Sequence, residues 1–185
     1  ALAAMTCISG PPWMPGKTEE LIRRLKRVKI ANLAVEIFKP RMDVRYDELN
    51  IVSHDENAIV STPVESAQSI LLLAHGVDVV GIDEAQFFDQ SIVEVCTTLA
   101  NNGKRIIVAG LDMDYEGKPF GPMPNLLAIA EFVTKVHAIC AQTGELASFS
   151  FRLTDSDSQV MLGEQGEYEA RSRRAFNEGM KKRKK

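Results

Sequence analysis

Residues 5–20 read MTCISGPPWMPGKTEE and contain the strongest fold signal in this chain. An apolar run from Met5 to Ser9 leads through a turn rich in glycine and proline to Gly16-Lys17-Thr18. A strand, a glycine-containing turn and a helix N-terminus, in that order, form a loop whose backbone N–H groups face phosphate oxygens. In such a loop Lys17 reaches the terminal phosphates, and the Thr18 hydroxyl binds Mg²⁺.

The spacing of this loop departs from the standard pattern. Five residues separate Gly10 from Gly16, whereas the pattern has four. Pro11, Pro12 and Pro15 also lack the N–H donor that would face a phosphate. We therefore expect weaker phosphate binding or a different loop path, and an ordinary strand–turn–helix junction is the alternative interpretation.

A second chemical signal lies where the apolar run Val77–Ile82 ends in Asp83 and Glu84. Ligands of parallel sheets bind at the carboxyl ends of the strands, where one acid can hold Mg²⁺. A neighbouring acid can accept the proton of an attacking hydroxyl. The alternative is two acids that open a surface loop.

Strand and helix patterns alternate from residue 5 to residue 139, which predicts an α/β fold. We expect a P-loop NTPase-like parallel sheet with flanking helices over residues 1–139. Residues 140–175 are expected to form a small C-terminal lobe, and residues 176–185 a basic, disordered tail. Predicted strands cover 5–9, 33–38, 77–82, 105–111 and 132–139, with shorter pieces at 51–52 and 59–60. Predicted helices cover 18–31, 65–74, 91–99 and 125–130.

Composition limits the cellular setting. The net charge of −3 gives no basic field for nucleic acid or membrane binding. The three cysteines are far apart and odd in number, which argues against a disulfide framework and fits a reducing compartment. We expect a soluble, cytoplasmic protein with no nucleic-acid or membrane partner.

Several separated segments together resemble the type II thymidine kinase family over residues 5–172. They are Gly-Lys-Thr-Glu-Glu-Leu-Ile-Arg-Arg at 16–24, Phe-Lys-Pro at 38–40, Asp-Val-Arg-Tyr at 43–46, Ser-His-Asp at 53–55, Asp-Glu-Ala-Gln-Phe-Phe at 83–88, Ala-Gly-Leu-Asp at 109–112 and Pro-Phe-Gly-Pro-Met-Pro at 119–124. The resemblance implies phosphorylation of the thymidine 5′-hydroxyl by ATP and Mg²⁺, and a homotetramer.

The resemblance also implies roles for individual residues. Glu84 would be the proton acceptor, with Arg45 and Lys17 as further catalytic groups, and Thr18 and Asp83 would hold Mg²⁺. The expected nucleotide-binding residues are Gly10, Gly16, Lys17, Thr18, Asp43, Asp83, Glu84, Ala85 and Gln86. The expected thymidine-binding residues are Gln86, Phe87, Phe120, Gln159, Val160, Met161, Leu162, Gly163 and Tyr168.

Structural roles are the alternatives for some of these side chains. Asp43 and Arg45 would form a loop-stabilising ion pair, and Phe120 or Tyr168 would serve packing alone. Phe88 is expected in the core, and His54 in a structural hydrogen bond.

Members of the family usually carry a structural zinc site in the lobe. The four corresponding positions here are Cys140, Thr143, Ser172 and Ala175. A tetrahedral site needs four ligands, and only Cys140 is a suitable one. We therefore expect no zinc, and a less rigid lobe unless packing replaces the metal.

Three functions remain open at this point. The first is an active thymidine kinase. The second is a catalytically impaired homologue that binds nucleosides or nucleotides, as suggested by the altered loop and the missing zinc ligands. The third is a different P-loop ATPase or phosphotransferase, whose ATP hydrolysis would not depend on thymidine.

Overall fold

A computed structural model describes residues 3–11, 16–42, 59, 61–154 and 167–184 of the chain. Within them a parallel sheet has the strand order β3-β2-β4-β5-β1-β6. Its strands are β1 (Ala4–Gly10), β2 (Val35–Pro40), β3 (Ser61–Val64), β4 (Val79–Ile82), β5 (Arg105–Leu111) and β6 (Phe132–Lys135). The helices around it are α1 (Gly16–Ile30), α2 (Ala67–Leu73), the single 3₁₀ turn η1 (Ala85–Phe87), α3 (Ser91–Asn101) and α4 (Met123–Ile129). The predicted α/β fold is confirmed.

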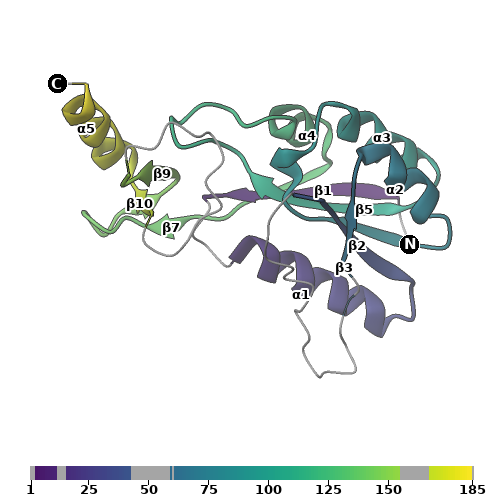
Figure 1. Cartoon of the computed structure of the whole chain (residues 1–185). Helices are drawn as coiled ribbons and strands as arrows, with labels where there is room; N and C mark the ends of the chain where they lie inside the picture. The colour runs from purple at the N-terminus through teal and green to yellow at the C-terminus, as the bar shows by residue number, and fades with distance from the viewer. Residues whose placement is uncertain (1–2, 12–15, 43–58, 60, 155–166, 185) are drawn as a thin grey trace.

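The sheet is covered by helices on both faces, with α1 on one and α2, α3 and α4 on the other (Figure 1). Neighbouring residues of a strand point to opposite faces. Ile8 therefore packs with Leu25 of α1, while Cys7 packs in the cluster that contains Ile92 of α3. Burial on both faces explains why β1 and β5 are continuous apolar runs.

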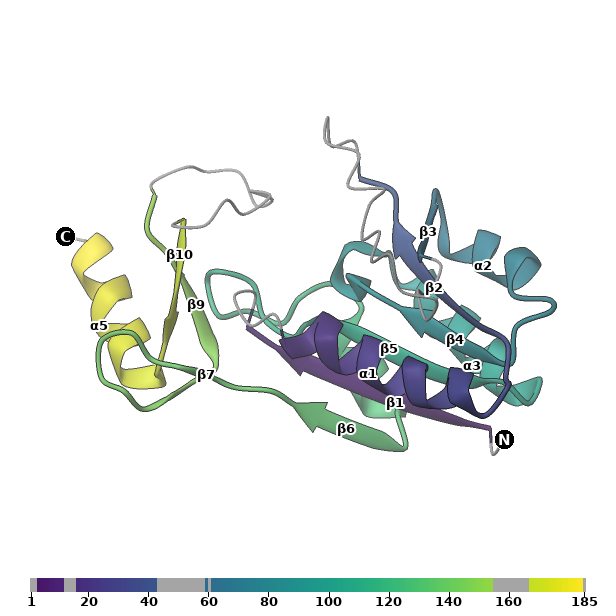
Figure 2. The same cartoon turned by 90° about the horizontal axis from the view of Figure 1, so that it is seen from below.

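The C-terminal lobe lies beyond the carboxyl ends of the sheet strands (Figures 1 and 2). Its elements are β7 (Ala138–Ile139), β8 (Leu146–Ala147), β9 (Phe149–Arg152), β10 (Tyr168–Arg171) and α5 (Arg173–Arg183). Strands β7 and β8 pair antiparallel, as do β9 and β10. The lobe therefore lies next to the carboxyl ends of the strands, where parallel sheets bind their ligands.

Two predictions about this region are wrong. The expected strand 132–139 is two strands, because the chain leaves β1 after Val136 and pairs Ala138 with Ala147 in a different sheet. The tail expected to be disordered is helical as far as Arg183. Ser172 caps this helix by accepting a hydrogen bond from the Ala175 N–H, and Phe176 anchors it in an aromatic cluster.

Strand β3 (Ser61–Val64) begins directly after the predicted piece at 59–60 and contains Pro63. Proline is tolerated there because β3 is an edge strand. The predicted piece at 51–52 lies outside the described residues. No helix in the described segments has the length and apolar character needed to cross a membrane.

Candidate functional site

The phosphate loop joins the end of β1 to the start of α1. Strand β1 ends at Gly10, and α1 begins at Gly16, so strand, turn and helix follow in the predicted order. The backbone N–H groups of Gly16, Lys17 and Thr18 belong to the first turn of α1, where no intrahelical acceptor exists for them. These donors and the helix dipole favour an anion at this end of α1.

Position 10 requires glycine because a neighbouring segment packs closely against its backbone, and not because its φ angle is positive. A Cβ atom built at this position would lie 2.6 Å from the carbonyl oxygen of Val136, which is too close for any side chain. Val136 is held in place because its N–H donates to the Ser9 carbonyl at 2.7 Å. The loop therefore starts against the segment that leads from β6 into the lobe.

Lys17 is buried, and its ammonium group donates to the carbonyl oxygen of Pro11. Burial lowers the pKa of Lys17, against the opposing effect of the Glu84, Asp83 and Asp112 charges. The ammonium group thus lies at the start of the loop, where the charges of three carboxylates act on it. A bound phosphate chain would offer it a stronger partner than a carbonyl.

Thr18 and Asp83 connect the phosphate loop to the acidic strand end. The Thr18 hydroxyl donates to an Asp83 carboxylate oxygen at 3.2 Å. These hard oxygen ligands fit Mg²⁺, which takes one or two carboxylates and completes its shell with phosphates and water. Within the described segments no group of three or more His, Cys, Asp and Glu could hold a metal by itself.

Asp83 has a perturbed acidity. Burial raises its pKa to about 6, with a further rise from the Glu84 charge, although the Glu84 N–H, Thr18 and Lys17 act to lower it. A carboxylate that is costly to ionise when its site is empty gains most from a bound cation.

A testable consequence concerns stability. Because the folded-state pKa of Asp83 exceeds the unfolded value of about 3.9, the ionised carboxylate destabilises the fold as pH rises from about 4 to about 6. We expect Asp83→Asn to stabilise the chain by about 2 kcal/mol more at pH 7 than at pH 4. Urea unfolding of both proteins at the two pH values measures this difference. An equal effect at both would contradict the raised pKa.

Glu84 occupies a strained turn immediately after Asp83. Its backbone is left-handed, with φ 52° and ψ 39°, a conformation that is costly for a residue with a side chain. Buried Gln86 holds the turn together: its amide nitrogen donates to the Glu84 carboxylate at 2.7 Å, and its amide oxygen accepts from the Leu111 N–H at 3.0 Å. Through Gln86, the backbone of β5 therefore fixes the direction of the exposed Glu84 carboxylate.

Aromatic side chains follow the acidic pair. Phe87 and Phe120 meet edge to face with ring centroids 5.7 Å apart, so the structure brings together two of the predicted nucleoside residues. Phe88 is buried in the core, as expected. Ala85 is also buried, which leaves its backbone rather than its methyl group available to a ligand.

Tyr168, at the start of β10, lies against an arginine that the sequence analysis missed. Its hydroxyl accepts a hydrogen bond from Arg152 at 3.1 Å, and the Arg152 guanidinium lies 3.7 Å from the ring centroid of Tyr115. The sequence offered one sign of Arg152, a single cation at the end of the short, mainly apolar strand β9. Asp112, whose charge acts on Lys17, was not predicted as a site residue either, although it follows β5 as Asp83 follows β4.

The four positions that correspond to the family's zinc ligands lie together in the lobe. The Thr143 and Ser172 hydroxyls are 3.5 Å apart, and the Ser172 hydroxyl accepts from the Ala175 N–H. Burial would raise the pKa of the Cys140 thiol, but hydrogen bonds from the Thr143 side chain and from nearby backbone groups lower it to about 6. One thiol, two hydroxyls and a methyl group do not fit a tetrahedral zinc site.

We expect the purified protein to contain far less than one zinc per chain when its metal content is measured by mass spectrometry. Prolonged dialysis against a strong chelator should leave its Tm unchanged, because no folding energy comes from the metal. Stoichiometric zinc, or a chelator-dependent fall in Tm, would contradict this prediction.

Packing stabilises the lobe where a metal would otherwise be expected. Phe149 stacks on Phe176 with centroids 4.8 Å apart, and Phe151 meets Phe176 edge to face. The Arg171 guanidinium lies 3.6 Å from the centroid of the Phe151 ring. Such aromatic and cation–π contacts connect β9, β10 and α5 directly.

Several predicted site residues lie outside the described part of the chain. They are Asp43, Arg45, Gln159, Val160, Met161, Leu162 and Gly163, together with His54. Their assignments remain predictions.

The fold and site together define a P-loop NTPase-like α/β protein. A crystal structure of the flagellar accessory protein FlaH from Methanocaldococcus jannaschii is similar, with a TM-score of 0.54, at 11% identity. The similarity covers 78% of this chain and 75% of that one, and at this identity it supports the fold alone.

The comparison with protein families is more specific. The thymidine kinase family model matches residues 3–176, so the chain belongs to the thymidine kinase family. The thymidine kinase of Rhodothermus sp. (strain ITI 518) is 63% identical over 161 residues, which is 87% of this chain and 76% of that protein. The thymidine kinase of Porphyromonas gingivalis (strain ATCC BAA-308 / W83) is 64% identical over 153 residues, which is 83% of this chain and 75% of that protein.

Proposed function

We propose that this chain transfers the γ-phosphoryl group of ATP to the 5′-hydroxyl of thymidine, giving dTMP for nucleoside salvage. Membership of the thymidine kinase family supports the substrates. The observation that carries the chemistry is the Glu84 carboxylate, held by Gln86 beside the Thr18–Asp83 pair. The proposed base, Glu84, is therefore the next residue after Asp83, the carboxylate of the proposed metal-binding pair.

Each group has a defined task in this proposal. The first turn of α1 and Lys17 hold the donor phosphates, and Lys17 offsets charge as the phosphoryl group moves. Thr18 and Asp83 hold Mg²⁺, which neutralises phosphate charge when bound. Glu84 orients the acceptor hydroxyl and removes its proton.

Aromatic groups are proposed to hold the thymidine. The edge-to-face pair of Phe87 and Phe120 offers a flat apolar surface to a base. Tyr168 is held by Arg152 and would close over the nucleoside from the lobe. Because both ends of the Gln86 amide are already engaged, its main task is to position Glu84.

The test is whether ADP formation depends on thymidine. We expect ADP and dTMP in equal amounts when ATP, Mg²⁺ and thymidine are all present. Thymidine binding without turnover at saturating ATP would instead favour the impaired homologue. ATP hydrolysis that is unaffected by thymidine would favour a different phosphotransferase or ATPase.

We also propose a homotetramer, as the family resemblance implies. Strand β6 is an edge strand of the sheet, and Phe132 and Val133 on it are 61% and 47% exposed. Unpaired edge strands with apolar side chains favour association with another chain. We propose that a second copy of this chain packs against this edge strand.

The three cysteines are buried free thiols, which suits the cytoplasmic location proposed here.

The assembly gives a further prediction. Phe132→Glu should shift the protein from four times the 20.5 kDa chain mass to a smaller species in analytical ultracentrifugation. Leu72→Glu is the matched control, because Leu72 is 82% exposed on α2, away from β6. A Phe132→Glu protein that sediments like the wild type would show that this edge is not an interface.

A further inference from the structure

One buried cation connects the C-terminal lobe to the part of the chain that carries the sheet. Arg152, the last residue of β9, is only 1% exposed. Its guanidinium lies 3.7 Å from the ring centroid of Tyr115 and donates a hydrogen bond to the Tyr168 hydroxyl at 3.1 Å. Tyr115 belongs to the segment between β5 and α4, whereas Tyr168 begins β10 in the lobe. A single side chain therefore contacts both parts of the protein.

The shape of the guanidinium allows both contacts at once. A guanidinium is planar, so its face can lie over an aromatic ring while the N–H groups in its plane donate to another partner. Arg152 and Tyr168 are paired residues of the antiparallel β9–β10 ladder, so their side chains emerge on the same face of it. One rigid group thus sets the position of the Tyr168 hydroxyl relative to the ring of Tyr115.

The ring of Tyr115 is carried by a tight hairpin, residues 113–119, which extends from the end of β5 toward the lobe (Figures 1 and 2). The two ends of the hairpin form an antiparallel bridge. Inside it, the buried Asp114 carboxylate accepts hydrogen bonds from the N–H groups of Glu116 and Lys118 at 2.9 and 3.0 Å. The hairpin is therefore held in shape by its own hydrogen bonds.

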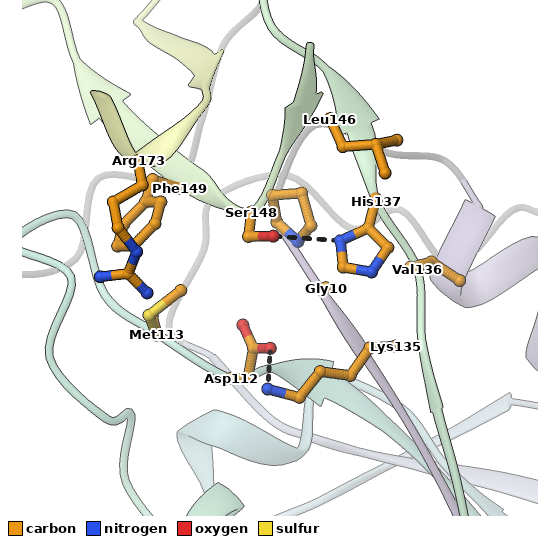
Figure 3. A pocket seen from close by; sticks show the side chains of 11 residues that line it. Gly10, Asp112, Met113, Lys135, Val136, His137, Leu146, Ser148, Phe149 and Arg173 are labelled. Carbon is orange, nitrogen blue, oxygen red and sulfur yellow. Dashed lines mark hydrogen bonds and ion pairs between the residues drawn. The ribbon is translucent and has the colours of Figure 1, made fainter. Parts of the chain in front are cut away.

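The hairpin also packs into the aromatic cluster of the lobe. Gly117 has a positive φ of 76°, and a Cβ atom there would lie 3.2 Å from the Phe176 ring and 3.3 Å from the Phe149 ring. Met113 packs against the same cluster, and Figure 3 shows Met113 and Phe149 on the same side of a pocket between the sheet and the lobe. The contact of the hairpin with the lobe thus extends beyond Arg152.

The base of the hairpin leads directly to the proposed nucleoside site. Phe120 is the next residue, and its N–H donates to the Asp112 carbonyl at 3.0 Å, which closes the base. The ring of Phe120 meets Phe87 edge to face. Tyr168 from the lobe and Phe120 from the sheet side are thereby linked to each other through Arg152 and the hairpin.

We propose that Arg152 is a positioning residue for thymidine binding, which acts through Tyr168. By lying over Tyr115 and donating to Tyr168, it holds Tyr168 at a fixed place relative to Phe120. The proposal rests on the proposed kinase function, because that function makes Tyr168 and Phe120 the residues that hold thymidine. It gives the hairpin a task as well, since the hairpin carries the contact from the lobe to the base of the nucleoside site.

Calorimetric titration with thymidine tests this role without turnover. Arg152→Lys keeps the charge but lacks the planar face and the in-plane donors. Thymidine should therefore bind about tenfold more weakly, the effect of losing one hydrogen bond to a charged group. Arg171→Lys is the matched control, because Arg171 is also buried and lies 3.6 Å from an aromatic ring centroid, that of Phe151, within the lobe. Both variants should lower the Tm, but only Arg152→Lys should weaken thymidine binding.

Changes to the two tyrosines separate positioning from stability. Tyr115→Leu removes the ring and should weaken thymidine binding, whereas Tyr115→Phe keeps the ring and should bind thymidine like the wild type. In a double-mutant cycle, Arg152→Lys and Tyr168→Phe together should weaken binding no more than either alone, because both break the same hydrogen bond. The KM for ATP should stay close to the wild-type value in all of these proteins.

The outcomes distinguish this role from the kinase function. Thymidine affinity that is unchanged in both Arg152→Lys and Tyr115→Leu, or that falls equally in Arg171→Lys, would overturn the positioning role and leave the kinase function intact. A wild-type chain that binds thymidine without phosphorylating it, with an affinity that still falls in Arg152→Lys, would refute the kinase function and support the positioning role. A wild-type chain that does not bind thymidine would refute both.

Discussion

Replacing Glu84 by glutamine is expected to lower kcat for thymidine phosphorylation by a factor of about 10² to 10⁴, the range for loss of a general base. The substitution preserves size and a hydrogen-bond acceptor for Gln86 Nε2, which now donates to Glu84 at 2.7 Å. The strained turn and its tie to Leu111 should therefore persist, while the ability to take a proton is lost. Steady-state rates of dTMP formation measure the effect.

Two measurements separate chemistry from folding in the Glu84→Gln protein. Thymidine affinity measured by calorimetry should stay close to the wild-type value, because the aromatic pair Phe87 and Phe120 is untouched. Glu94→Gln makes the same chemical change at an exposed position of α3 and should leave kcat unaltered. Turnover of Glu84→Gln within a few-fold of wild type would show that another group accepts the proton.

The sequence predicted the sheet well because the sheet is buried on both faces. Strands such as β4 and β5 are apolar at successive positions, and glycine or acids mark their ends. The same logic located Asp83 and Glu84. It could not foresee the left-handed backbone of Glu84, which depends on Gln86 reaching Leu111, 25 positions along the chain.

The lobe was predicted less well for a physical reason. Its core joins Phe149 and Phe151 to Phe176, residues that are far apart in sequence and carry no shared periodicity. Residues 181–185 are all lysine or arginine, and this run of charge suggested a disordered tail. The helix α5, which includes the start of the run, packs through few apolar contacts. Local patterns identify amphipathic helices only when the apolar face recurs over several turns.

Lys17→Met should lower kcat/KM for ATP by about 10² to 10³, the range for removing one group that stabilises transition-state charge. The Tm should not fall, because burial lowers the pKa of Lys17 and its charge therefore costs folding free energy at neutral pH. The pKa of Asp83 should rise above about 6, since Lys17 now acts to lower it. Kinetics, thermal unfolding and carboxyl NMR titration measure these three effects.

The control for Lys17→Met is Arg27→Met, which removes a cation from an exposed position of the same helix and should change neither kinetics nor the Asp83 pKa. The comparison bears directly on the lengthened phosphate loop. Because Pro11 lacks an N–H donor, we expect phosphate binding to rely more heavily on the Lys17 ammonium and on the first turn of α1. A Lys17→Met protein that still used ATP at the wild-type KM and kcat would show that the phosphates are held by another route.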